Sequence, residues 1–548
     1  MRFAYIVLAL ACVACSADTG RQWADTVIVN GKVFTGVPDA QNAQAVAIRD
    51  GRILTVGSDA EIEVWVGEST EVVDARGRRV IPGLTDAHAH FGVRPAGSRL
   101  QLENGPTPDP SPMAVLSAVA AEVEKPSGEG WIYAEVGPAV LADKSLRSAA
   151  LDRVSPERPV MLWSFTGHGT IFNSAGLAAI GLEEPQDVPG GWCERDARGQ
   201  CTGLLREMLE FRARREQRRT VTTRELAAAY RSAADDYLRW GVTAVHEMAL
   251  GHPLQQTVAA LGEANPELRW SLYRAPVLRH SLDEAWQQDF GNLPLPSSVR
   301  LAGIKWILDG TPVEGGAATK AVYADLNAWR GQLNFSDNEI RRILSQGLER
   351  DEQLALHASG DRTLEAIFTA MGELAPPEVW REHRLRIEHG DMVNGDLVDR
   401  AATYGAVLVQ NPLHFDKLPI LQQRFTSAQK AKFQQVRAAW EKPLPMALGS
   451  DAGGPGRNPY LNIMFAAMNP VAPDQALTVN QALSAYSLGG AYAEKREVER
   501  GTLQPGMLAD LAILSQDILE VPLPQLPATQ SVLTMVGGEI VYRAPAAK

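Results

Sequence analysis

The middle of the sequence repeats one pattern, a short apolar stretch followed by a helix-like stretch, about eight times. The strand candidates are residues 80–86, 242–246, 269–273, 302–308, 353–357, 384–388, 406–410 and 445–450. Helix-like stretches such as residues 222–241 and 336–353 open with Ser or Thr beside acidic residues, as helix N-caps do. Alternation of strand and helix over this length predicts an α/β fold, a distorted (β/α)8 TIM barrel at residues 81–499.

Two further regions interrupt or flank the barrel pattern. The connection after the first strand is far too long for a single helix, so we expect residues 92–225 to form an inserted lobe. Towards both ends of the chain, apolar and polar residues alternate, and Asn-Gly or Asp-Gly pairs near the start mark hairpin turns. Residues 21–80 and 500–545 are therefore expected to form one small β-sandwich built from both termini.

Residues 1–20 have the composition of an export signal. Arg2 precedes an apolar run that is too short to span a membrane and that is followed by small residues. The surroundings of Cys12 and Cys15 partly match a bacterial lipoprotein cleavage box. We expect an exported protein, either periplasmic or lipid-anchored to a bacterial membrane. Simple cleavage without lipidation and an uncleaved N-terminal anchor are the alternatives.

The charge of the chain limits the classes of partner. The formal net charge is -12 at pH 7, whereas binding to nucleic acid requires a basic face that neutralises phosphates. The sequence therefore argues against a nucleic-acid partner and is compatible with a small-molecule substrate.

Two cysteines, Cys193 and Cys201, lie on either side of an Asp-Ala-Arg-Gly turn in the predicted lobe. An exported chain meets an oxidising compartment, in which cysteines placed across a hairpin can pair. We expect these two to form a disulfide. A zinc site is the weaker alternative, because two ligands do not complete a structural zinc site.

Most histidines of the chain follow predicted barrel strands. The polar residues at these strand ends are Asp86, His88, His90, His246, Glu247, Lys305, His357, His389, His414 and Asp451. A barrel builds its active site at the carboxyl ends of its strands, so these side chains are expected to meet at one mouth. His88 and His90 alternate along a strand and therefore face the same side, where both imidazoles can reach one metal ion.

Each candidate also has a structural explanation. A lone His-x-His is a weak motif. His357 could be a capped strand end, His389 part of a structural His-Glu pair, and Asp451 a helix N-cap. Lys305 could form a salt bridge with Asp309 or Glu314 instead of carrying a carbamate that binds metal. His168, His246 and His414 are either contacts to substrate or transition state, or packed polar groups of the core.

Ten stretches, found in order along the chain, together resemble one family. They include VIPGLTDAHAHF, RPVMLWSFTGHGTIFNSAGL, GVTAVHEM, GIKWILDG, LALHASGDRTLEAI, RLRIEHG, VLVQNPLHF, ALGSDAGG and GTLQPGMLADLAIL. The sequence resembles the amidohydrolase superfamily, and within it amidohydrolase family 3, the YtcJ-like branch. The resemblance departs from the branch at Glu247 and in the segment after the lysine strand, DGTPVEGGAATK, and we place both departures near the mouth.

The resemblance implies a centre of two divalent ions, most simply zinc, although manganese and iron also suit these ligands. The first ion would be held by His88, His90 and Asp451, the second by His357 and His389, and a carbamylated Lys305 would bridge them. Asp451 would also shuttle a proton, and His414 could hold the oxyanion. In the lobe, the resemblance implies that Trp163, His168 and Trp192 cap the pocket and select the substrate. His246, at the end of a barrel strand, would contact the substrate as well. A homodimer is plausible by the same resemblance.

We therefore expect an exported, metal-dependent amidohydrolase that cleaves a C–N bond of a small amide or N-acyl compound through a metal-activated hydroxide. Hydrolysis of an ester, a carbamate or a cyclic amide, or deamination, at the same centre is an alternative. A lipoprotein that keeps the fold and binds a ligand without turnover is another. Lys305 and Asp451 distinguish the enzyme from the binding protein, since a binding protein does not need them.

Overall fold

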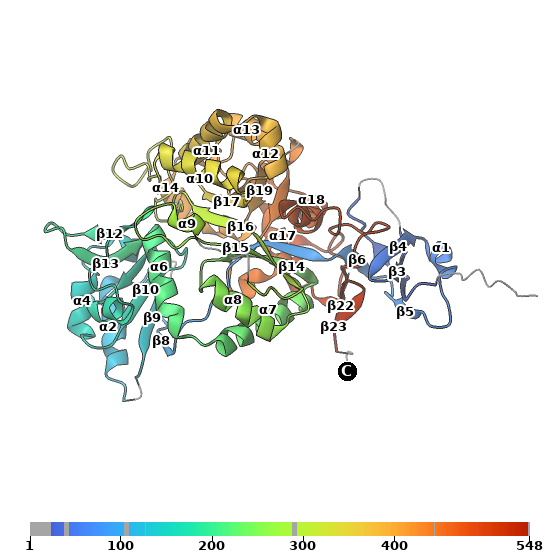
Figure 1. Cartoon of the computed structure of the whole chain (residues 1–548), viewed down its shortest axis with the longest axis horizontal. Coiled ribbons are helices and arrows are strands. Elements are labelled where there is room, and N and C mark those ends of the chain that lie inside the picture. Colours follow the sequence, from blue (N-terminus) through green and yellow to red (C-terminus); the bar gives the residue numbers. More distant parts are fainter. Residues whose placement is uncertain are drawn as a thin grey trace, which may run out of the picture.

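The computed structural model describes residues 23–37, 43–102, 109–126, 128–287, 293–442 and 444–545. Its central sheet has eight parallel strands in the order β20-β19-β18-β17-β16-β15-β14-β7 (Figure 1). The strands are β7 (Leu84–Ala89), β14 (Val242–Ala249), β15 (Arg269–Arg274), β16 (Val299–Ile307), β17 (Gln353–Ala358), β18 (Arg386–His389), β19 (Val407–Gln410) and β20 (Met446–Leu448). The end strands β20 and β7 lie in contact, so the sheet is a nearly closed barrel, which confirms the predicted fold class.

Helices surround the barrel because each presents one apolar face to it. They include α7 (Thr223–Arg239), α8 (Leu254–Ala264), α10 (Asp337–Glu349), α11 (Asp361–Leu374), α12 (Pro377–His383), α13 (Asp396–Tyr404), α17 (Pro459–Met468) and α18 (Val479–Ser484). Thr222 and Ser336 form capping boxes at the starts of α7 and α10, in agreement with the predicted N-caps. In α10, Ile340, Ile343 and Leu344 are buried and lie on one face of the helix.

The long connection between β7 and α7 folds as a lobe around a separate six-stranded sheet, seen in teal at the left of Figure 1. The sheet strands, in spatial order, are β12 (Gly191–Arg195), β13 (Cys201–Arg206), β11 (Thr170–Phe172), β10 (Val160–Ser164), β9 (Trp131–Val136) and β8 (Gly97–Arg99). Its helices include α2 (Pro112–Val123), α4 (Ser148–Val154), α5 (Ser174–Ala179) and α6 (Glu207–Gln217). Cys193 and Cys201 are joined by a disulfide between the paired strands β12 and β13.

The terminal regions form two sheets that lie beyond the barrel on the side away from the lobe (Figure 1). One contains β1 (Thr26–Val29), β3 (Ala45–Arg49), β4 (Arg52–Gly57) and β5 (Glu71–Asp74). The other contains β2 (Lys32–Val33), β6 (Arg79–Pro82), β21 (Leu511–Leu514), β22 (Ser531–Val536) and β23 (Glu539–Arg543). Ile28 and Val46 of the first sheet share one core with Leu511 and Leu533 of the second. Only the second sheet joins the two ends of the chain, and the first is wholly N-terminal.

The export signal expected at residues 1–20, with Cys12 and Cys15, lies outside the described residues. Within the described ranges, no helix has the length and apolar character needed to cross a bilayer.

Candidate metal centre

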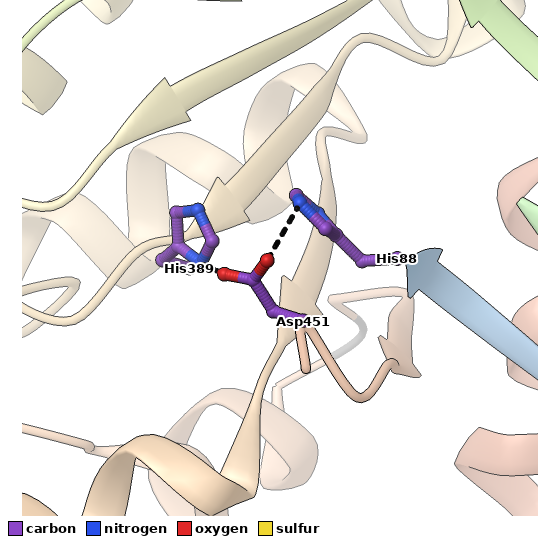
Figure 2. Close-up of side chains that lie close together, drawn as sticks. All are labelled: His88, His389 and Asp451. Carbon is purple, nitrogen blue, oxygen red and sulfur yellow. Dashed lines mark ion pairs between the residues drawn. The ribbon is translucent and has the colours of Figure 1, made fainter. Parts of the chain in front are cut away.

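Three side chains from separate parts of the chain meet at the mouth of the barrel. His88 lies on β7, His389 ends β18, and Asp451 follows β20. Each offers a ligand atom within 4.8 Å of those of the other two, and Figure 2 shows the carboxylate of Asp451 between the two imidazoles. Histidine nitrogens and a carboxylate oxygen at such separations are suited to hold one divalent ion.

His90 completes this group as the alternation along β7 predicts. Its Nε2 lies 3.3 Å from Nε2 of His88 and 3.1 Å from Oδ1 of Asp451. Its other ring nitrogen, Nδ1, lies 3.0 Å from the carbonyl oxygen of Met248, which makes Nδ1 the donor and leaves Nε2 a free lone pair. Two imidazole nitrogens and a carboxylate oxygen that converge in this way fit a shared cation.

The orientation of His88 is set by a buried pair of charges behind it. Oε2 of Glu388 lies 2.5 Å from Nδ1 of His88, and the guanidinium of Arg386 donates to Glu388 from Nε at 2.8 Å. Although burial opposes it, the charge of Arg386 and the contact with His88 lower the pKa of Glu388. Burial in turn lowers the pKa of His88 to about 4, so the imidazole is neutral and Nε2 can bind metal.

The backbone at two of these residues is unusual. His389 has φ of 69° and Asp451 has φ of 45°, a left-handed conformation that costs energy for any residue with a Cβ. The backbone N–H of Asp451 donates to the carbonyl of His88 at 2.8 Å. Together these features aim both side chains into the mouth instead of along the barrel wall.

Lys305 on β16 is 1% exposed and lines the same cavity. No group in the described part of the chain forms a hydrogen bond with its Nζ. The proposed salt-bridge partners are engaged elsewhere: Asp309 accepts from the backbone of Ser359 and Gly360, and Glu314 accepts from Ser164 of the lobe. Burial lowers the pKa of Lys305 to about 8. The structural alternative for this lysine is therefore not realised, and its amine loses its proton more readily than that of an exposed lysine.

His357 and His389 form the second imidazole pair, with ring centroids 4.4 Å apart. Nδ1 of His389 lies 2.8 Å from Oδ1 of Asn411, and Nε2 of His357 lies 3.3 Å from the carbonyl of Gly310. Burial lowers the pKa of both imidazoles well below the ordinary value, so both are neutral and able to act as ligands. The structure thus places all six residues of the predicted ligand set around one cavity, which has a volume of about 740 Å3.

His414 and His168 approach the ligand set from two sides. Nε2 of His414 lies 3.3 Å from Oδ2 of Asp451, and although burial opposes it, Asp451 raises the pKa of His414. The ring of His168 lies 4.7 Å from that of His357. Although burial opposes it, Glu207 raises the pKa of His168 to about 9. Both imidazoles line the cavity, and that of His168 is cationic near neutral pH.

Two of the predicted substrate contacts lie elsewhere. His246 is fully buried, with Nδ1 3.0 Å from Nη1 of Arg386, and does not line the cavity. It belongs to the polar interior of the barrel, because the alternation along β14 directs it inwards below the mouth. Trp192 lies on β12, a lobe strand remote from the mouth, and does not line the cavity either, whereas Trp163 does.

The two departures from the family pattern lie in different parts of the structure, and only one of them is at the mouth. Glu247 does not lie at the mouth: it is buried against α7, where the hydroxyl of Tyr230 donates to it at 2.8 Å. Thr311, Pro312 and Val313, from the segment after the lysine strand, do line the cavity. His252 and His383, which do not line the cavity, are both buried.

Replacing Glu247 by Gln is expected to change how stability depends on pH. Burial raises the pKa of Glu247 to about 8 from its ordinary 4.5, so the folded chain retains a proton that the unfolded chain releases. The stabilising contribution of the protonated carboxyl is complete below pH 4.5 and is lost as the pH rises through about 8. The melting temperature of the wild type, relative to that of Glu247→Gln, should therefore fall over this interval. A difference in melting temperature between wild type and Glu247→Gln that does not change with pH would contradict the expectation. Glu263→Gln, at an exposed position, is the control and should show no such pH dependence.

Sequence reasoning missed the residues that support the ligands. Glu388, Arg386 and Asn411 orient His88 and His389. Glu388 directly precedes a predicted ligand, so its position beside His389 was a usable signal. Four arginines of the lobe side also line the cavity, namely Arg94, Arg99, Arg214 and Arg218. No spacing or motif marks these four in the sequence.

Comparison with known proteins agrees with this geometry. A sequence model of the amidohydrolase family matches residues 71–542. The YtcJ amidohydrolase of Bacillus subtilis (strain 168) is 26% identical over 535 residues, which cover 93% of this chain and 98% of that protein. An N-substituted formamide deformylase from Arthrobacter pascens is 26% identical over 546 residues, covering 95% and 99% respectively. In fold, the chain is similar to an uncharacterized metal-dependent hydrolase from Pyrococcus horikoshii OT3, with a TM-score of 0.67, 20% identity, and coverage of 91% and 99%.

Proposed function

The chain belongs to the amidohydrolase family, and we propose that it hydrolyses a C–N bond in a small amide or N-acyl compound with the help of divalent metal ions. The observation that carries the proposal is the convergence of neutral imidazoles, one carboxylate and an unpartnered lysine in one cavity. A binding protein has no need to keep these costly buried groups. The relative that acts on N-substituted formamides supports an N-acyl substrate.

The donor set fits two ions. His88, His90 and Asp451 would hold one, and His357 and His389 the other; zinc suits these ligands. Lys305 has no partner in the described structure. Its neutral amine can add to the carbon of CO2 and release one proton, and the resulting carbamate would bridge the ions as an anionic ligand. Bound ions supply Lewis acidity, which polarises a carbonyl and makes water acidic enough to ionise near neutral pH.

The chain's own residues then move protons and hold charge. Asp451 accepts the proton of the attacking water and delivers it to the leaving nitrogen. His414 helps to keep this carboxylate ionised, because its hydrogen bond lowers the pKa of Asp451 against the effect of burial. His414 faces the cavity, and its ring N–H donates a hydrogen bond to the oxygen that becomes negative in the transition state.

The lobe closes the cavity over these groups. Trp163, Phe165 and Phe211 line it opposite the barrel, and Ser164 donates to Glu314 of the barrel at 2.7 Å. This contact ties the lobe loop to the barrel loop that follows β16. Closure of this kind excludes water and strengthens the electrostatic interactions beneath it.

We also propose that residues 1–20 direct export to the periplasm, with or without a lipid anchor, and that the enzyme forms a homodimer. The Arg2-led apolar run and the disulfide in the lobe support export.

A substrate screen tests the proposed reaction. Protein loaded with zinc is offered N-substituted formamides, N-acyl amines and N-acyl amino acids beside matched esters, and released amine or alcohol is measured. We expect amine release that a chelator abolishes, and about two ions per chain by elemental analysis. Variant His280→Gln, at an exposed histidine outside the cavity, should behave as wild type. Well under one ion per chain, with no effect of the chelator, would contradict the proposal; ester cleavage alone would favour the alternative reaction.

A further inference from the structure

The lobe side of the cavity carries positive charge that its surroundings do not balance. Among the arginines that line it, Arg99 pairs with Glu135 at 3.1 Å and Arg214 with Glu210 at 3.4 Å. Across the described ranges, no carboxylate lies within ion-pair distance of Arg94 or Arg218, which also line the cavity. These two guanidiniums are therefore free to meet a charge that enters from outside.

Arg218 directly follows α6, is 7% exposed, and its buried Nε has no hydrogen-bond partner in the described structure. Its guanidinium lies between two glycines. A Cβ at Gly92 or at Gly251 would lie 2.6 Å from Nη1 of Arg218, so any larger residue at either position would displace the group. Gly92 is two residues beyond His90, which places Arg218 close to the ligand set.

Arg94 is held by an aromatic ring. Its guanidinium carbon lies 3.8 Å from the centroid of the Trp163 ring, a stacking contact that fixes the group without neutralising it. Its Nε, like that of Arg218, is buried without a partner in the described part of the chain. Burial and the neighbouring arginines lower the pKa of Arg94 to about 10 and hold that of Arg218 well below its ordinary value. Both charges are thus held at an energetic cost that an anion would relieve.

We propose that Arg218 and Arg94 bind a carboxylate on the substrate, so that the enzyme acts on anionic N-acyl compounds in preference to neutral amides. The inference rests on the proposed function, since it places the scissile bond at the histidines and Asp451 of the same cavity. The planar fork of a guanidinium matches a carboxylate with two parallel hydrogen bonds. Burial makes such a pair stronger than one in water, and it would orient the acyl nitrogen towards the ligand set.

Binding can be measured without turnover. The zinc-loaded enzyme is titrated by calorimetry with N-methanesulfonyl derivatives of glycine, leucine and phenylalanine, each as the free acid and as the neutral carboxamide. In these compounds a sulfonyl group replaces the N-acyl group at the proposed scissile position. We expect at least one acid to bind about tenfold more tightly than its amide, and the ratio to fall at least about fivefold in Arg218→Met and in Arg94→Met. Arg219→Met changes the adjacent, exposed arginine and should keep the wild-type ratio.

Three results would overturn the inference: equal affinities for acid and amide, no binding of any acid, or a preference for the acid that survives both Arg218→Met and Arg94→Met. The last would show that the carboxylate meets the metal instead. If Arg218→Met melts far below the wild type, Arg218→Lys, which keeps the charge but not the fork, replaces it and should lower the ratio in part. Failure of the proposed hydrolysis would show in the substrate screen and leave these ratios unchanged.

Discussion

Asp451→Asn should lower kcat/KM by about 10³-fold, the magnitude typical of losing a group that moves protons in the transition state. Asp451 lies 3.1 Å from His90 and 3.3 Å from His414, and it is the one carboxylate in the three-residue ligand cluster of the described chain. The amide keeps the shape of the side chain and removes both its negative charge and its capacity to accept a proton. Asn also tolerates the left-handed backbone at this position, so the fold should survive.

The measurement is steady-state turnover of the best substrate from the screen, with metal content and melting temperature recorded for each protein. Asp474→Asn, at an exposed site in a short helix, is the matched control and should retain full activity. More than a tenth of wild-type kcat/KM in Asp451→Asn, with metal bound, would refute the proton-transfer role.

Lys305→Met should reduce bound metal from about two ions per chain to one or fewer, and should lower turnover at least about 100-fold. Met has similar length and no nitrogen, so it removes the amine that would carry the carbamate. The same change should leave the metal-free protein as stable as the wild type, or more stable by about 1–3 kcal/mol, because an unpartnered buried amine costs free energy. Loss of metal without loss of stability separates ligation from folding.

Elemental analysis gives the metal count, and ¹³C NMR after growth with labelled bicarbonate reports the carbamate carbon in wild type. That signal should be absent from Lys305→Met. Lys417→Met alters another lysine that lines the cavity and that is paired with Asp416, and it should keep both the signal and the metal. Full metal content in Lys305→Met would contradict the proposal that Lys305 carries the bridging ligand.

Much of the barrel could be predicted because its pattern is local. Each predicted barrel strand overlaps an observed one, for example residues 353–357 and β17 (Gln353–Ala358). Buried parallel strands read as apolar runs whatever their partners are. The gathering of His88, His357, His389 and Asp451 followed from one rule, that the carboxyl ends of the barrel strands share a face.

The wrong predictions concern residues whose role depends on which way the side chain points. His246 and Glu247 both end a predicted strand, yet His246 points into the barrel interior towards Arg386 and Glu247 points outwards to Tyr230 on α7. Period-two alternation predicts that the two neighbours oppose each other. It does not set the depth of a residue within a tilted barrel, so neither could be excluded from the mouth.

The amino-acid sequence by itself determined the class of fold, the polar residues that gather at the mouth and the family, because strand period, helix caps and spaced histidines are properties of neighbouring residues. Tertiary structure alone decided which lobe residues reach the cavity, and that Lys305 Nζ, Arg94 Nε and Arg218 Nε have no hydrogen-bond partner among the described residues. The physical reason is that an unbalanced buried charge is a property of everything around it. Gly92 and Gly251, far apart in the chain, together make the space for Arg218, and no local pattern records such a meeting.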